Sequence, residues 1–149
     1  MRLFALFATT VIATMADGAT FRVDDSLSLP SESTIPMNWR SLAPSRAAGN
    51  AVEGASALTI RLNLAPWITR NGKIYMALPE QPIGTVTANW TTQGKLLPGQ
   101  LNSGNRTLVY AGPIRARILE DTIYLKLAAD GRRLAAPQRL QFYFEIDVD

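Results

Sequence analysis

Hydrophobic and polar residues alternate along much of this chain, and most regularly in its last ten residues. Leu140, Phe142, Phe144, Ile146 and Val148 occupy every second position, and Gln, Tyr, Glu and Asp fill the positions between them. Side chains of a strand point alternately to its two faces, so this pattern predicts a strand with one apolar face and one polar, acidic face. An edge strand of this kind needs protection against unwanted pairing.

Shorter alternating segments separated by Gly and Pro fill the body of the chain. They predict strands at 57–64, 73–78, 83–90, 107–111, 114–118 and 123–127. Turn signals stand at Asn71-Gly72, Glu120-Asp121 and Asp130-Gly131, and the segment 45–56 is typical of a loop. No window has a convincing helical period. Many short strands with Gly and Pro turns predict an all-β sandwich.

A further alternating segment runs from Thr20 to Leu29. Phe21, Val23, Leu27 and Leu29 share one face of the predicted strand, with Asp25 in the same row. Prolines at positions 30 and 36 follow it within a polar stretch. Because proline is unfavourable inside a sheet, we expect a short linker between this strand and the body of the protein.

The first residues have the pattern of an export signal. Met1-Arg2 is a short basic start, and Leu3 to Ala16 is an uncharged apolar run, too short to span a bilayer. We expect cleavage after Ala16 or after Gly18. The alternative, a buried N-terminal helix, would need an amphipathic pattern that this run lacks. The sequence therefore predicts an exported protein.

Length and composition fit one packed domain after the signal. The chain has 149 residues, of which 47% are apolar and 18% charged. We expect a signal peptide at 1–18, an N-terminal strand and linker at 19–36, and a β domain at 37–149.

The composition also narrows the chemistry that is expected. The chain has no cysteine, which excludes disulfides and thiolate metal sites, and no histidine, the most frequent general base and metal ligand. Neighbouring carboxylates such as Asp24 and Asp25 point to opposite faces of a strand and make poor catalytic partners. We expect no enzyme activity, no metal and no cofactor. The net charge of +3 without a dense basic run predicts no nucleic-acid partner.

Two groups of side chains are weaker binding candidates. Trp39, Trp67 and Trp90 are candidates for a sugar-stacking platform, although single tryptophans on separate strands more often pack in a core. Arg115 and Arg117 share one face of a predicted strand, where a solvated charged face is the more frequent role than an anion site.

The two ends of the chain, considered together, resemble those of a known protein family. An export signal, an alternating N-terminal strand on a Pro-containing linker, a cysteine-free β body and an alternating C-terminal strand resemble subunits of Gram-negative chaperone–usher fimbriae. The resemblance covers the whole chain in outline and is nearest to minor subunits of cysteine-free, enterotoxigenic-type fimbriae. It implies an immunoglobulin-like sandwich that lacks its final strand, exported through the periplasm to the cell surface.

The resemblance also implies roles for both terminal strands. In that family a periplasmic chaperone fills the groove beside the C-terminal strand, and the N-terminal strand of the neighbouring subunit later replaces it at the outer-membrane usher. Phe21, Val23, Leu27 and Leu29 would be the donor residues. The acceptor side would be lined by Leu140, Phe142, Phe144, Ile146 and Val148. Burying four large donor side chains would contribute on the order of 6–12 kcal/mol.

The expected function is therefore that of a structural or accessory fimbrial subunit that contributes to bacterial adhesion. Two alternatives remain open. The domain could itself be a tip adhesin that binds a host receptor or glycan, although its N-terminal strand favours a subunit that also donates. It could also be a self-contained periplasmic β-sandwich binding protein, in which residues 21–29 pair within their own sheet.

Overall fold

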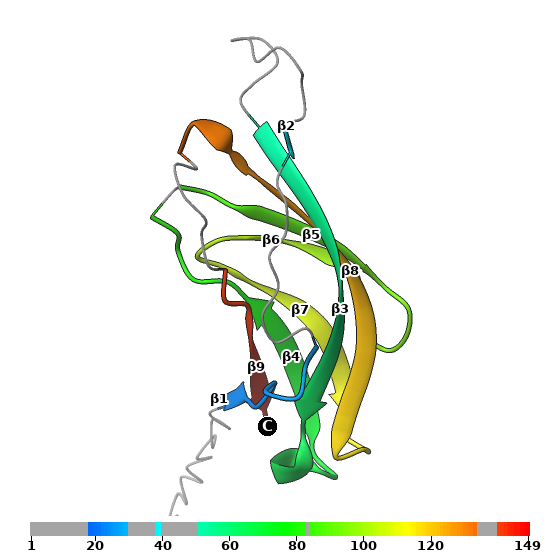
Figure 1. Cartoon of the computed structure of the whole chain (residues 1–149). Helices are drawn as coiled ribbons and strands as arrows, with labels where there is room; N and C mark the ends of the chain where they lie inside the picture. Colours follow the sequence, from blue (N-terminus) through cyan, green and yellow to red (C-terminus); the bar gives the residue numbers. More distant parts are fainter. Residues whose placement is uncertain (1–17, 30–37, 40–50, 83, 134–139) are drawn as a thin grey trace, which may run out of the picture.

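The protein folds into two antiparallel β-sheets that pack face to face (Figure 1). The computed structural model describes residues 18–29, 38–39, 51–82, 84–133 and 140–149. Within these ranges the only helical elements are two 3-10 turns, η1 (Ala65–Trp67) and η2 (Gly131–Arg133). The predicted all-β class is confirmed. The expected signal peptide, apart from Gly18, and the expected linker at 30–36 lie outside the described residues.

The first sheet contains both ends of the described chain. Its four strands follow the order β1 (Ala19–Val23), β9 (Tyr143–Val148), β4 (Asn71–Ala77) and β7 (Arg106–Pro113). Every neighbouring pair is antiparallel. The N-terminal strand therefore lies directly beside the C-terminal strand, at one edge of the sheet (Figure 1).

The second sheet is built around two long strands. Its order is β2 (Asn38–Trp39), β3 (Ala51–Asn63), β8 (Ile118–Asp130), β5 (Thr87–Thr92) and β6 (Gly99–Asn102), again with antiparallel pairs. β3 and β8 pair along their whole length of 13 residues each. In Figure 1 this long pair runs down the right-hand side of the sandwich.

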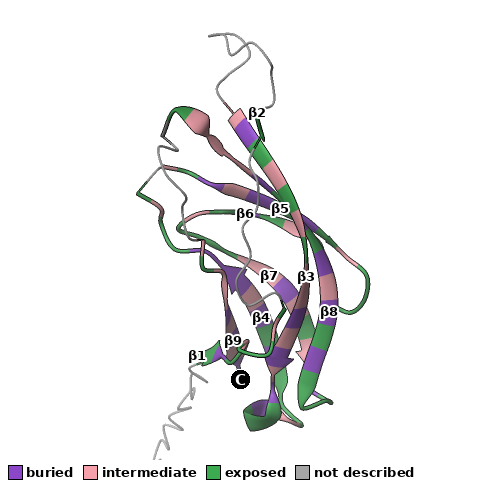
Figure 2. Ribbon diagram, in the orientation of Figure 1, coloured by how far each residue is buried: buried purple, intermediate pink, exposed green. Residues whose placement is uncertain are grey.

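Apolar side chains from the inner faces of both sheets form one core. Ile74, Met76 and Ile146 come from the first sheet, and Leu62 and Leu125 from the second. Along β8 and β9 buried positions alternate with more exposed ones, as Figure 2 shows by colour. This period of two is the strand periodicity that the sequence predicts, with one face of each sheet toward the core and the other toward solvent.

Several predicted boundaries are wrong, and the long strand pair explains two of them. Glu120-Asp121 is not a turn but lies inside β8, where Asp121 belongs to the inward row. Residues 51–56, predicted as part of a loop, form the first half of β3 because their backbone pairs with the end of β8. Residues 114–117, predicted to begin a strand, form a loop between β7 and β8. Gly72 lies inside β4, and the chain turns before it.

The two sheets are connected at both of their lateral edges, by different contacts. On one side β6 and β7 meet, with the Thr107 hydroxyl donating to the Gln100 carbonyl at 2.6 Å. On the other side the N-terminal segment passes from the first sheet to the second. It pairs with β9 through β1, and then with β3 through the bridge between Asp24 and Asn63. The N-terminal segment thus joins both sheets, next to the strand that the sequence singles out.

Candidate functional site

The C-terminal strand has the inward face that its alternation predicts. Phe144, Ile146 and Val148 are fully buried between the sheets. Leu140 and Phe142 precede the regular part of β9 and are partly buried against the same core. All five predicted acceptor residues therefore contact or belong to the core, and the strand begins three residues later than predicted.

The edge of this strand is covered in the single chain. β1 pairs with β9 in antiparallel register from Ala19 opposite Val148 to Val23 opposite Phe144, while β4 pairs with the other side of β9. The expectation that the last strand leaves an open edge is wrong for the isolated chain. The prolines that predict a spacer come after residue 29, so they do not prevent residues 19–23 from reaching the strand.

The core holds β1 through a single residue. Val23 is 1% exposed and is the only residue of β1 that is buried. Phe21 faces the same side, opposite Ile146, but remains 43% exposed at the rim, where its ring lies 5.9 Å from that of Trp67. Of the four predicted donor residues, these two have the inward phase and one is fully enclosed.

The predicted strand from Thr20 to Leu29 is too long. It ends at Val23, because the Asp24 carboxylate accepts the Ser26 N–H at 3.0 Å and turns the backbone. Leu29 then pairs with Thr59 of β3 in an isolated bridge. Leu27 and Leu29 are 56% and 55% exposed and lie beyond the end of the strand, and their role as donor residues stays a prediction.

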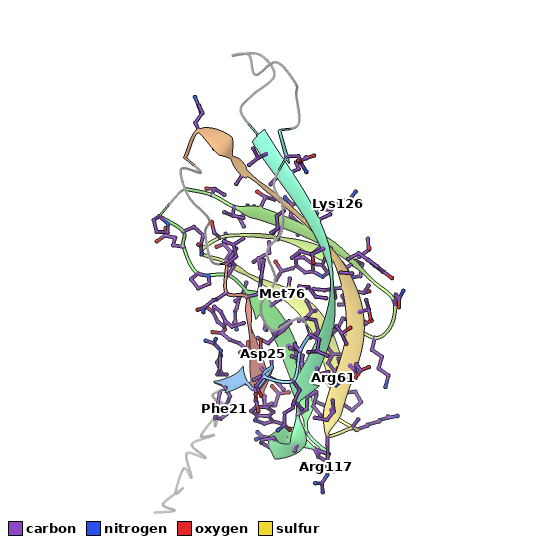
Figure 3. The ribbon with its side chains drawn as sticks, in the orientation of Figure 1. Phe21, Asp25, Arg61, Met76, Arg117 and Lys126 are labelled. Atoms are coloured by element: carbon purple, nitrogen blue, oxygen red, sulfur yellow. The ribbon has the colours of Figure 1, made fainter. Side chains whose placement is uncertain are left out.

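Asp25, labelled in Figure 3, lies at the bend where the chain leaves the first sheet, next to the bridge between Asp24 and Asn63 of β3. It is half-buried, and desolvation raises the pKa of its carboxyl group above the usual value. The Asp25 carbonyl accepts the Ser28 N–H at 2.9 Å and so closes a turn. The carboxylate therefore occupies a bend between the sheets, which explains how the chain tolerates an acid in its apolar row.

Polar contacts on the outer face of the first sheet join β1, β9 and β7. The Thr20 hydroxyl donates to Asp147 at 2.6 Å, and Arg106 donates to the same carboxylate at 3.1 and 3.2 Å and to Glu145 at 3.2 Å. These bonds lower the pKa of Asp147, with Arg106 as the first cause, and raise that of Arg106. The Arg22 guanidinium lies 4.1 Å above the centre of the Tyr143 ring.

The tryptophans whose side chains the structure describes pack in the core, the more frequent role, and do not form the candidate sugar platform. Trp67 and Trp90 are both buried, and the Trp90 indole N–H donates to the Leu97 carbonyl at 3.0 Å. The backbone of Trp39 pairs with β3, and its side chain lies outside the described set. Arg115 and Arg117 are exposed, on the loop after β7 and not on a strand.

Among the residues that the structure describes, one ionisable side chain is buried, at a position where the sequence pattern predicts a turn. Asp121 is 6% exposed, and its carboxylate accepts the backbone N–H groups of Gly94 and Leu96 at 2.8 and 2.9 Å. A third N–H, from Thr122, donates to it at 2.7 Å. The acid therefore fixes the turn that follows β5. The sequence does contain one indication that Asp121 is buried, because it alternates in phase with the apolar residues Leu119 and Ile123.

Among the described residues, no three His, Cys, Asp or Glu side chains are grouped as metal ligands would be. No helix in these ranges is long and apolar enough to cross a membrane. Comparison of the chain with protein-family models, with curated proteins and with solved structures finds no match.

Proposed function

We propose that this chain is a structural or accessory subunit of a bacterial fimbria, exported to the cell surface and assembled by a periplasmic chaperone and an outer-membrane usher. In this proposal the sandwich is immunoglobulin-like, and β1 occupies the place of a final strand that the rest of the domain lacks. A chaperone strand first replaces the chain's own β1 beside β9. The β1 strand of the neighbouring subunit then replaces the chaperone strand.

The observation that carries the proposal is the shallow attachment of the strand that covers β9. Only Val23 of its five residues is buried, although the strand pairs alongside the buried residues Phe144, Ile146 and Val148 of β9. Burial of one valine side chain contributes about 1.5–2 kcal/mol, much less than the 6–12 kcal/mol expected for four donor side chains. A domain stable by roughly 5–15 kcal/mol can release such a strand without unfolding.

The position of β1 in the sheet also supports exchange. It is an edge strand with a single partner, β9, so its removal breaks one ladder and leaves the pairing of β9 with β4 intact. An incoming extended segment would then find unpaired backbone groups beside an apolar face, as in strand addition elsewhere. The exposed Phe21 would gain further burial if a neighbouring groove were deeper than the rim at Trp67.

A self-contained exported sandwich is the second candidate, and a specific observation favours it. β1 already pairs with β9 of its own chain, and Thr20 and Arg22 contact Asp147 and Tyr143 of that strand. In this alternative β1 never leaves its own sheet. The mature protein is then a stable, soluble monomer without a partner.

Cross-linking distinguishes the two candidates. Because the chain has no native cysteine, introduced cysteines can react only with each other. Arg22 lies opposite Glu145, so an R22C/E145C chain, oxidised or treated with a short thiol cross-linker, has β1 fixed to its own β9. We expect this fixed chain to be excluded from fibres and from chaperone complexes, and reduction to restore an oxidised chain. When R22C and E145C are expressed as separate chains, cross-links should join neighbouring subunits.

The matched control fixes a pair that exchange does not separate. Arg61 of β3 lies opposite Glu120 of β8, with an ion pair of 2.5 Å, so R61C/E120C links two interior strands in the same way. This control should assemble like the wild type. If the R22C/E145C chain, once fixed, also assembled at wild-type yield, strand exchange would be excluded. If the wild type itself stayed a soluble monomer that no chaperone captured, the self-contained sandwich would stand.

A further inference from the structure

A hollow at the end of the sandwich is lined by two cationic side chains above apolar walls. Its volume is about 350 Å³, near the lower end of the roughly 300–1,000 Å³ of small-molecule sites. Lys95 and Arg115 contribute the charges, and Tyr110 contributes an aromatic ring with its hydroxyl. The apolar part comes from Leu64, Pro113, Ile114, Ala116, Ile118 and Leu119.

Both cations are carried by segments that the fold holds in place. Lys95 lies between Gly94 and Leu96, whose N–H groups both donate to the buried Asp121 carboxylate. Arg115 lies on the loop after β7, where the Ile114 N–H donates to the Arg70 carbonyl at 2.8 Å. A ligand would therefore meet two charges whose backbones are already ordered, which reduces the entropy lost on binding.

Further bonds fix the same loop at both of its ends. The Tyr110 hydroxyl donates to the Pro113 carbonyl at 2.7 Å, and the Leu64 N–H donates to the Arg117 carbonyl at 2.7 Å. The Thr69 N–H donates to the Ile114 carbonyl from a residue with φ of 71°, an uncommon conformation for a β-branched residue. Figure 3 shows Arg117 at this end of the molecule.

The charges at this hollow are not matched within the described part of the chain. Neither Lys95 nor Arg115 has an ion pair with another described residue. The one carboxylate of the lining, Glu120, is already paired with Arg61 at 2.5 Å. The site therefore offers two donors to an anion, and the apolar walls beside them suit the carbon skeleton of a small ring.

We infer that this hollow binds a small carboxylated sugar, with its carboxylate between Lys95 and Arg115 and its ring against Tyr110. Carboxylates form charge-assisted bonds with both cation types, and the two cations approach from different segments. This inference goes beyond the proposed function and does not depend on it, since it involves neither β1 nor β9. In a fimbrial subunit the site would engage surface glycans.

The test is a titration of the isotopically labelled full chain, followed by NMR, with sodium glucuronate and with glucose as its neutral counterpart. Glucuronate should shift the amide signals around Lys95, Tyr110 and Arg115, and glucose should bind at least about tenfold more weakly. R115Q and K95Q should each weaken glucuronate binding about tenfold. K126Q removes the same charge from a site that Figure 3 places away from Arg117, and should leave the affinity unchanged.

Three results would overturn the inference. Equal binding of glucose and glucuronate would mean that the carboxylate is not recognised. If sodium sulfate bound with the same affinity as glucuronate at matched ionic strength, the hollow would be a general anion site that does not recognise the sugar ring. An unchanged affinity of R115Q and K95Q, with signals showing that both variants are folded, would place binding elsewhere.

Discussion

We expect β1 to open as a unit of its own, before the rest of the sandwich unfolds. The perturbation that tests this is V23A, since Val23 is the one buried side chain of the strand. The substitution removes two carbon atoms from the core, worth about 0.8 kcal/mol each, and leaves a small cavity. The free energy of β1 opening should fall by about 1.5–2 kcal/mol, which is a 10- to 30-fold loss of protection.

Native-state hydrogen exchange measures this opening directly. The control is L125A, which removes a fully buried side chain from β8 in the other sheet. It should lower the free energy of global unfolding by about 2–5 kcal/mol. Leu125 lies opposite Ser56 and Trp90 within the second sheet, and β8 does not pair with β1, so the amides of β1 should keep their wild-type protection.

Separate opening of β1 would be refuted if the β1 amides of the wild type exchanged with the same free energy as the amides of β3 and β8. Both V23A and L125A would then lower the protection of β1, each by the amount that it takes from global stability. Such a result would make β1 an integral strand of the sandwich and would remove the physical basis for exchange.

Two further predictions concern the acidic groups. The bonds from Arg106 and Thr20 hold the folded-state pKa of Asp147 below its ordinary value, so they stabilise the fold above about pH 4, and this contribution is lost as pH falls through the folded pKa. Only the Thr20 bond is broken when β1 opens, so this bond makes the docking of β1 depend on pH. Hydrogen exchange between pH 6 and 3 should show β1 opening more readily in acid, and D147N should reduce this dependence; an equal dependence in D147N would contradict it. D121A should destabilise the protein by about 2–5 kcal/mol in urea unfolding because two turn N–H groups lose their acceptor, and D121N should cost less. A loss below about 0.5 kcal/mol would mean that water replaces the carboxylate.

The sequence by itself determined the fold class and the inward face of the last strand. Both depend on the alternation of side chains, which is a local property: Phe144, Ile146 and Val148 are buried because every second residue of a strand faces the core. The same rule gave the inward phase of Phe21 and Val23. It failed after Val23, because the Asp24 side chain bonds to the backbone of Ser26 and ends the strand.

Only the tertiary structure decided which strand lies beside β9, because pairing between residues 19 and 148 depends on how the whole chain closes. It also decided the role of Asp121, which looks like a turn residue in the sequence but accepts bonds from Gly94 and Leu96, some 25 residues away. The hollow with Lys95 and Arg115 has the same origin, since two loops distant in sequence meet at one end of the sandwich. Alternation determines the face of each strand, and the contacts between distant segments determine its neighbours.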